Sequence, residues 1–313
     1  MQTRMSGRDT AVALLTTFIW GLNFVVIRWG LGEWPPLFFA ALRFAVVAVP
    51  AVFIIGRNGL PWRLVLATGS LVGVGYFSLL FVGMQLGMPP GLSALVSQAQ
   101  VLFTALFSVW LLRQRPTAWQ WCGMGVAGAG LYLSAGNSLD LAPLAGFALV
   151  LLAALFWGMG NIMMKKLGGG MKVDGFRLTI WMSLVPIVPN LILSFWTEQG
   201  QWEALSHISW MGAFAVLYTA WGSTIIGWGA WAWLLRKYAA PQVAPFSLLV
   251  PVVTLVIAVS LGMEPLKPET GMAAALLLGG VALTLFGDRL GGFCLRRQWL
   301  RPRAAEDGYS TKS

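Results

Sequence analysis

The apolar run TAVALLTTFIWGLNFVVIRWG, residues 10–30, decides the fold of this chain. It contains one charged residue, Arg28, in 21 positions. About 20 consecutive apolar residues are enough for an α-helix to cross the hydrocarbon core of a bilayer. A helix also satisfies its own backbone hydrogen bonds, which lipid cannot do. The run therefore predicts a transmembrane helix.

The rest of the chain has the same character. Hydrophobic residues make up 58% of its 313 residues, charged residues only 10%, and the mean hydropathy is +0.74. Soluble domains carry about 25% charged residues, so this chain has too few charges to cover a water-facing surface. We expect an all-α polytopic membrane protein. Ten apolar segments can be marked along it, at 10–30, 37–55, 64–86, 91–112, 118–135, 143–163, 177–196, 210–234, 241–262 and 270–287.

The basic residues test this number of spans. The net charge is +10, and the segments are taken to alternate across the membrane from a cytoplasmic N-terminus. Of the 21 Lys and Arg residues, 18 then fall on the cytoplasmic side, Arg28 and Lys267 fall outside, and Arg43 lies within the second segment. Lys and Arg collect in the cytoplasmic loops of membrane proteins. We therefore expect ten transmembrane helices with both termini cytoplasmic, in a bacterial inner membrane.

The two halves of the chain resemble each other. The first segment contains Trp20-Gly21 followed by Asn23, and the sixth contains Trp157-Gly158 followed by Asn161. Because five spans is an odd number, the second half would be inserted upside down. Inverted repeats are typical of secondary transporters, whose substrate site lies between the repeats near the midplane. We expect two inverted five-helix repeats, at 1–138 and 139–288, and a basic and polar cytoplasmic tail at 289–313.

Arg43 is the most conspicuous candidate for a substrate contact. A charge inside a span costs about 2.5–3.5 kcal/mol on insertion scales. A guanidinium binds a carboxylate with two parallel hydrogen bonds, so Arg43 could anchor a substrate carboxylate. The alternatives are a structural pairing with Glu33 or with helix-end carbonyls, or a side chain that reaches the membrane surface.

Polar residues on two other segments indicate a cavity. In the fourth segment Ser97 and Gln100 belong to a stripe with spacings of three and four, which is one helix face, whereas Gln98 points elsewhere. In the ninth segment Ser247 and Pro251 occupy corresponding positions. A proline inside a span frees a backbone carbonyl, which suits a hinge or a substrate-facing kink, or a tolerated kink without function.

Amides and aromatic rings complete the candidate site. Asn23 and Asn161 need polar partners in hydrocarbon, so we expect both to face the bundle interior. In the eighth segment Tyr218, Trp221 and Trp228 recur at spacings of three and seven and could wall a cavity, although tryptophans also mark membrane interfaces. The residues expected to bind substrate are Trp20, Asn23, Arg43, Ser97, Gln100, Trp157, Asn161, Trp228, Ser247 and Pro251.

Other functional classes lack the residues they need. No acidic residue lies within a segment, nor does the single histidine, His207, and Cys122 and Cys294 form no pair at metal or redox spacing. We expect no enzyme, metal, cofactor or nucleic-acid partner. Because proton-coupled carriers usually keep a titratable group inside the membrane, we expect downhill or indirectly coupled transport. A monomer or a homodimer, another cargo such as aromatic amino acids or drugs, and a non-transporting receptor or subunit stay open.

Three stretches resemble the EamA family of the drug/metabolite transporter superfamily: WGLNFVVIR (20–28), GMPPGL (87–92) and VAPFSLLVPVV (243–253). The resemblance extends over nearly the whole chain before about residue 288. It implies two inverted five-span halves around a central cavity and export of small metabolites, with O-acetylserine and cysteine handled by the most similar members. For such zwitterions, Arg43 and the amides of Asn23 and Gln100 would suit a carboxylate and an ammonium group.

The chain departs from the family pattern after the fourth and ninth segments. The family usually has a Glu-Arg pair at both places, but this chain has Gln114-Arg115 and Glu264-Pro265. The resemblance therefore implies that a charge clamp formed by such pairs is altered here.

Overall fold

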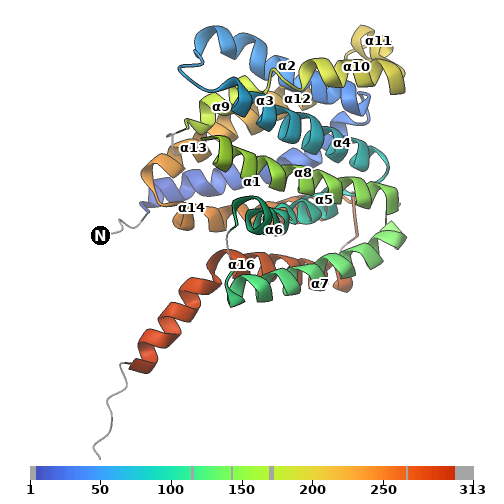
Figure 1. The fold of residues 1–313 in the computed structure, drawn as a ribbon. Helices are drawn as coiled ribbons and strands as arrows, with labels where there is room; N and C mark the ends of the chain where they lie inside the picture. The colour runs from blue at the N-terminus through green and yellow to red at the C-terminus, as the bar shows by residue number, and fades with distance from the viewer. Residues whose placement is uncertain (1–4, 114–115, 142–143, 169–172, 266, 300–313) are drawn as a thin grey trace, which may run out of the picture.

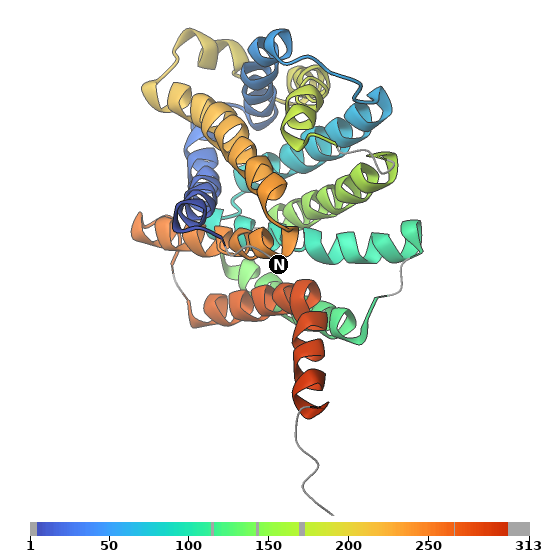
Figure 2. The same ribbon diagram turned by 90° about the vertical axis from the view of Figure 1, so that its left-hand side faces the viewer.

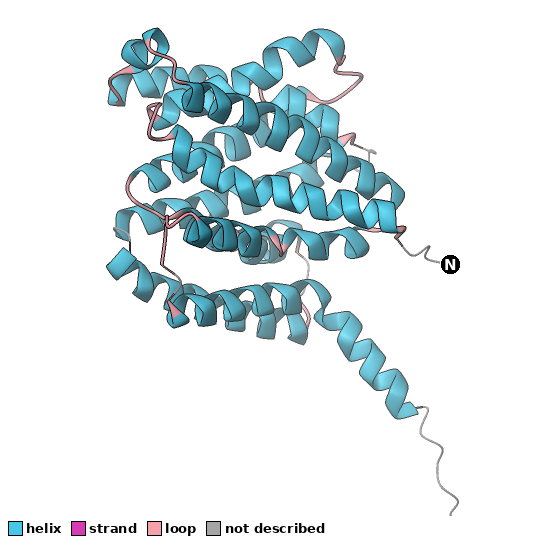
Figure 3. Cartoon of the chain, turned by 180° about the vertical axis from the view of Figure 1, so that it is seen from behind, coloured by secondary structure: helices cyan, strands magenta, loops and turns pink. Residues whose placement is uncertain are grey.

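A computed structural model describes residues 5–113, 116–141, 144–168, 173–265 and 267–299, and within them the chain is helical without a strand (Figures 1 and 3). Gln114 and Arg115 lie outside the described residues. In chain order the elements are α1 (Gly7–Gly30), α2 (Pro36–Ile54), α3 (Trp62–Thr68), η1 (Gly69–Tyr76), α4 (Phe77–Gln85), α5 (Pro90–Ser97), α6 (Gln100–Leu112), α7 (Ala118–Leu141), α8 (Leu144–Gly168), α9 (Gly175–Met182), α10 (Ile187–Thr197), α11 (Gln201–Ser206), α12 (Trp210–Leu217), η2 (Tyr218–Gly227), α13 (Trp228–Lys237), α14 (Ala240–Ser247), α15 (Val250–Ser260) and α16 (Pro268–Trp299).

Helical backbone covers each of the ten predicted segments. In the described part of the chain, eight helical stretches are long and apolar enough to cross a membrane. The segments predicted at 118–135 and 210–234 lie on α7 and on the stretch α12–η2–α13, which are not among those eight. The all-α class of a multi-pass membrane protein is therefore confirmed, and the number of ten spans stays a prediction.

Helices from the two halves of the chain pack against each other. The helix α1 lies against α15 and η2, α8 lies against α6 and η1, and α2 lies against α10. In both views of the ribbon, α7 and α16 run side by side along one edge of the bundle (Figures 1 and 2). No single half of the chain therefore forms the bundle by itself.

Two glycines allow close approaches at the junctions of α1 with α15 and of α8 with α6. A Cβ on Gly21 of α1 would lie 2.6 Å from Val253 of α15, and a Cβ on Gly158 of α8 would lie 2.8 Å from Phe103 of α6. Small residues let membrane helices pack backbone to backbone. Gly21 and Gly158 follow directly after Trp20 and Trp157, so these close contacts place the neighbouring aromatic rings at the same helix junctions.

Several of the predicted spans are not continuous α-helices. The fourth breaks after Ser97, between α5 and α6, and the ninth breaks after Ser247, between α14 and α15. Pro251 stands in the first turn of α15, where its missing N–H is tolerated, and it explains the second break. The third and eighth spans each contain a π-helical segment, η1 or η2. Such segments often mark functional sites.

One end of the bundle, which we call the distal end, lies away from the N-terminus and carries α11 (Figure 1). Here two carboxylates cap helices of the other half of the chain. Glu198 accepts hydrogen bonds from the backbone N–H groups of Leu37 (2.8 Å) and Phe38 (3.2 Å), and Glu264 accepts one from Gly91 (2.8 Å). A carboxylate at a helix N-terminus satisfies free N–H groups and matches the helix dipole. The distal end is thus tied across the two halves.

Candidate functional site

A cavity of about 280 Å³ lies between the two halves. This volume is close to the lower end of the roughly 300–1,000 Å³ found for small-molecule sites. Helices from both halves line it, and none of the described lining residues carries a charge. The lining residues are Trp20, Asn23, Phe24, Tyr76, Phe77, Leu80, Ser97, Gln98, Gln100, Trp157, Asn161, Ser223, Trp228, Trp231, Ser247 and Val250.

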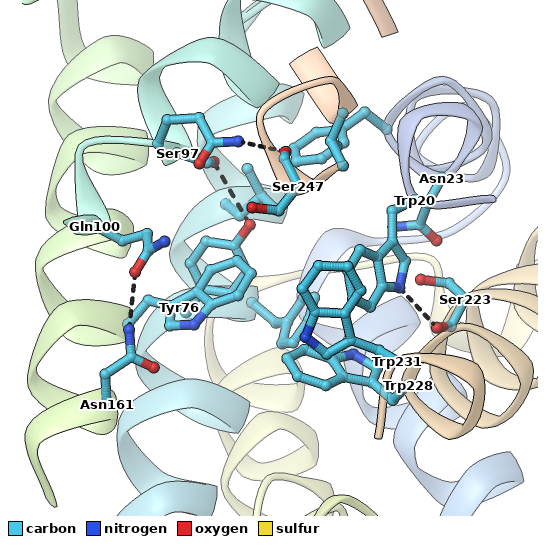
Figure 4. A pocket seen from close by; sticks show the side chains of 16 residues that line it. Trp20, Asn23, Tyr76, Ser97, Gln100, Asn161, Ser223, Trp228, Trp231 and Ser247 are labelled. Atoms are coloured by element: carbon cyan, nitrogen blue, oxygen red, sulfur yellow. Dashed lines mark hydrogen bonds between the residues drawn. The ribbon is translucent and has the colours of Figure 1, made fainter. Parts of the chain in front are cut away.

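Aromatic rings form a continuous row along the cavity (Figure 4). The ring of Trp20 lies 5.1 Å from that of Trp231 and 5.2 Å from that of Trp228. Trp228 lies 6.5 Å from Trp157, which in turn lies 4.3 Å from Tyr76 in an edge-to-face arrangement. Pairs at these separations attract each other beyond simple burial. The row therefore holds its own geometry and offers π-faces to a ligand.

Hydrogen bonds orient two of these rings. The indole Nε1–H of Trp20 donates to the backbone carbonyl of Ser223 at 3.1 Å (Figure 4). The hydroxyl of Tyr76 lies 3.5 Å from Oγ of Ser97. Since Ser223 belongs to η2 and Tyr76 ends η1, both π-helical segments contribute directly to the cavity wall.

A polar side faces this row. The amide Nδ2 of Asn161 donates to Oε1 of Gln100 at 2.8 Å and to Oγ1 of Thr104 at 3.1 Å. Gln98 donates through Nε2 to the backbone carbonyl of Ser247 at 3.1 Å. These bonds join helices of different halves and leave the other atoms of the amides for a ligand.

Asn23 differs from Asn161, although the sequence places them at matching positions. Asn23 is 6% exposed, and its Oδ1 is buried without a hydrogen-bond partner among the described residues. Leaving a buried acceptor unpaired costs about 1–3 kcal/mol. A donor supplied by a ligand in the cavity would remove that cost.

Most of the predicted site residues come together here. Eight line the cavity, and the two that do not are Arg43 and Pro251. Pro251 is buried next to the lining residue Val250. The eight that line it are Trp20, Asn23, Ser97, Gln100, Trp157, Asn161, Trp228 and Ser247.

The placement of Gln98 is a correction, because the sequence pattern put it off the cavity face and it lines the cavity. Gln98 lies in the break between α5 (Pro90–Ser97) and α6 (Gln100–Leu112), so its side chain does not follow the face of a continuous helix. Tyr218 and Trp221 also differ from expectation. Tyr218 donates its hydroxyl to the carbonyl of Ile19 at 3.0 Å, and Trp221 is 48% exposed. Both lie in η2, where the helical period differs from that of an α-helix.

Some cavity residues gave little sequence signal. Tyr76 and Phe77 lie in an apolar segment without regular polar spacing, and Ser223 is one of several small polar residues. Trp231 could have been found, because it lies one helical turn beyond Trp228 on the same face.

Arg43 lies behind the cavity wall and is 1% exposed. Its Nη2 donates to the carbonyl of Thr219 at 3.2 Å and to Oγ1 of Thr224 at 2.9 Å, both in η2. Its Nε and Nη1 have no partner among the described residues. The guanidinium lies over the ring of Phe77, with Cζ 4.2 Å from the ring centroid. Arg43 therefore neither reaches the membrane surface nor lines the cavity.

Apolar helices that enclose a neutral, aromatic and amide-lined cavity between two halves of one chain define a membrane transporter. Comparison with known proteins gives the family. The model of the EamA-like transporter family matches residues 10–136 and again residues 144–286. The chain therefore belongs to the EamA-like transporter family, and its two matches correspond to the two halves.

Relatives extend this result over the whole chain. The chain is 38% identical to a "Probable amino-acid metabolite efflux pump" of Salmonella typhimurium LT2 over 291 residues, which is 91% of this chain and 97% of that protein. A protein of the same description from Escherichia coli K12 is 38% identical over 290 residues, with the same coverage of both chains. The chain is also 27% identical to the "Uncharacterized inner membrane transporter YedA" of E. coli K12, covering 87% of this chain and 89% of that protein.

A solved structure supports the fold. A chain described only as "Crystal structure of protein" matches with a TM-score of 0.62 and 20% sequence identity, over 91% of this chain and 99% of that chain. At this identity the likeness concerns the fold alone.

Proposed function

We propose that this protein is a bacterial inner-membrane exporter of amino acids and related small metabolites of the O-acetylserine and cysteine kind. It has ten spans in two inverted repeats and works by alternating access around the cavity. The observation that carries the proposal is the neutral cavity lined by both halves of a chain whose 38%-identical relatives are described as probable amino-acid metabolite efflux pumps.

The packing of the helices supports the inverted repeat. Helix α1 of the first half packs against α15 and η2 of the second half. Helix α8 of the second half packs against α6 and η1 of the first half. These are the same pairs with the halves exchanged, as a twofold relation between repeats requires. The breaks of the fourth and ninth spans and the π-helical segments of the third and eighth also correspond.

The contacts at the distal end of the bundle support alternating access. The caps at Glu198 and Glu264 hold the two halves together at the distal end. Rocking of one half against the other would open these caps. Pro251, beside the break of the ninth span, suits a hinge for this movement.

Aromatic amino acids are the second candidate cargo. Seven of the 16 lining residues are aromatic, and a ring in the substrate could stack on the row from Trp231 to Tyr76. This candidate changes the substrate side chain and leaves the transport mechanism as proposed.

Counterflow in proteoliposomes tests the proposal. Vesicles of purified protein are preloaded with one unlabelled amino acid, and uptake of labelled cysteine, O-acetylserine, threonine or phenylalanine is followed without an ion gradient. We expect accumulation with at least one small zwitterion, reduced about tenfold or more in Trp228→Ala. Trp210→Ala, in the same helical stretch but with an 89% exposed side chain, should transport like the wild type.

Two results would contradict the proposal. Absence of counterflow with every member of the panel would reject amino-acid export. Uptake that strictly requires an imposed pH gradient would agree with an exporter but contradict the expectation of downhill transport.

A further inference from the structure

Arg43 carries a positive charge that the described part of the protein does not neutralise. The guanidinium stays protonated at any physiological pH. The two ion pairs found among the described residues are Lys237–Asp9 and Arg236–Asp174, and neither involves Arg43. Its hydrogen bonds go to neutral oxygens of Thr219 and Thr224, and two of its nitrogens have no partner among the residues that the structure describes.

The ring of Phe77 separates this charge from the cavity. Phe77 lines the cavity and also lies under the guanidinium, at 4.2 Å from Cζ to the ring centroid. A ligand atom in van der Waals contact with the face of Phe77 that is turned away from the guanidinium would lie roughly 8 Å from Cζ. At an effective dielectric constant of about 20, a unit negative charge there would bind roughly ten- to thirtyfold more tightly than a neutral group. Arg43 can thus act on a ligand through its field, without touching it.

The Trp20 end of the aromatic row offers acceptors for a positive charge. Trp20 lies against Trp228 and Trp231, and in Figure 4 Asn23 lies beside Trp20. The Oδ1 atom of Asn23, which has no partner in the described part of the chain, can accept a hydrogen bond, and indole faces attract ammonium groups. The row runs from this end through Trp157 and Tyr76 to Phe77, whose ring lies 4.8 Å from that of Tyr76.

We propose that the cavity binds a zwitterion in one orientation, with its carboxylate at the Phe77 end, selected by the field of Arg43, and its ammonium at the Trp20 and Asn23 end. The inference rests on the proposed function, because it assigns the orientation of that same substrate. In this arrangement Arg43 is a specificity-determining residue, and loss of its charge affects carboxylates and leaves their neutral analogues unchanged.

Ligand binding by calorimetry to the purified full chain in nanodiscs tests the proposal. The probes are L-cysteine and L-threonine, each compared with its own carboxamide, which keeps the ammonium group and lacks the carboxylate charge. We expect the wild type to bind each amino acid about tenfold or more tightly than its carboxamide. Arg43→Gln should lower the affinity for the amino acids by about that factor and change the affinity for the carboxamides by less than about twofold.

Three variants separate the field from other roles of the same residues. Arg43→Lys keeps the charge and should keep the preference for the carboxylate. Thr224→Val removes one acceptor of the guanidinium, keeps the charge, and should also keep the preference. Asn23→Leu should lower the affinity for an amino acid and for its carboxamide equally, because both carry the ammonium group. It should leave the affinity for the N-acetylated amino acid unchanged.

The possible outcomes test the orientation of the ligand and the proposed function separately. A wild type that binds carboxamides as tightly as amino acids overturns the orientation, even if Arg43→Gln does not fold. An equal loss of affinity for both ligands in Arg43→Gln also overturns it, because that pattern indicates that Arg43 only supports the structure of η2. A wild type that neither binds nor transports any amino acid rejects the proposed function itself.

Discussion

The cap formed by Glu264 predicts that the distal end of the bundle responds to pH. Glu264 lies between α15 and α16, is 7% exposed, and accepts a hydrogen bond from the N–H of Gly91 at 2.8 Å. Burial raises the pKa of the Glu264 carboxyl to about 7, against the lowering effect of the backbone hydrogen bond from Gly91. Desolvation of the charged form is therefore the dominant effect on this group.

The sign of the effect follows from proton linkage. Between the ordinary pKa of 4.5 and a pKa of about 7, the capped state holds a proton that the open or unfolded state has lost. Stability of the capped state therefore falls as pH rises through this window and is constant above it. At about 1.4 kcal/mol for each unit of pKa, the change is at most about 3 kcal/mol, or roughly a hundredfold in the opening equilibrium.

Hydrogen exchange of the amides at 91–93 measures this opening. Between pH 5 and pH 8, after correction for intrinsic exchange, we expect their protection to fall in the wild type by up to about a hundredfold. In Glu264→Gln the amide oxygen can still accept from Gly91, without a charge, so protection should be independent of pH and higher than in the wild type at pH 8.

The cap of α2 by Glu198 provides the internal control. Exchange at Leu37 and Phe38 should be the same in the wild type and in Glu264→Gln at each pH. Wild-type protection at 91–93 that does not change between pH 5 and pH 8 would refute the reasoning. So would a pH dependence that persists in Glu264→Gln.

Three further substitutions, with Gly125→Ala as a control, test the packing of the bundle. In Gly91→Ala the new Cβ would overlap Oε1 of Glu264, so we expect faster exchange at 91–93 with little change elsewhere; unchanged exchange would contradict the cap. Gly158→Leu overpacks the junction with Phe103 and should lower the free energy of unfolding by about 1–3 kcal/mol, measured by thermal unfolding. The control Gly125→Ala, with open space around it, should change this free energy by less than about 0.5 kcal/mol. Trp20→Phe leaves the Ser223 carbonyl without its 3.1 Å donor and should cost about 1–3 kcal/mol; wild-type stability and wild-type binding together would show that this bond does not position the ring.

Local sequence was sufficient for the helices and for eight of the 16 residues of the cavity wall. Apolar runs of about 20 residues form helices wherever lipid replaces water, because the backbone has no other way to satisfy its hydrogen bonds. The matching positions of Trp20 and Asn23 in one half and Trp157 and Asn161 in the other identified four residues that line the cavity. Polar residues in apolar helices turn inward for the same reason in any fold.

Tertiary structure decided which face each of the other side chains presents. Gln98 lines the cavity because it lies in the break between α5 and α6, where its side chain does not follow the face of a continuous helix. Tyr218 and Trp221 depart from the expected face because a π-helical segment changes the period.

The position of Arg43 depended on a packing partner far away in the chain. Its guanidinium is held by Thr219 and Thr224 and is separated from the cavity by Phe77. The sequence by itself established that a buried cation in a span needs partners, because a charge in hydrocarbon is costly. Only the tertiary structure decided that those partners are neutral oxygens of η2 and an aromatic ring, because contacts between distant segments exist only after the helices have packed.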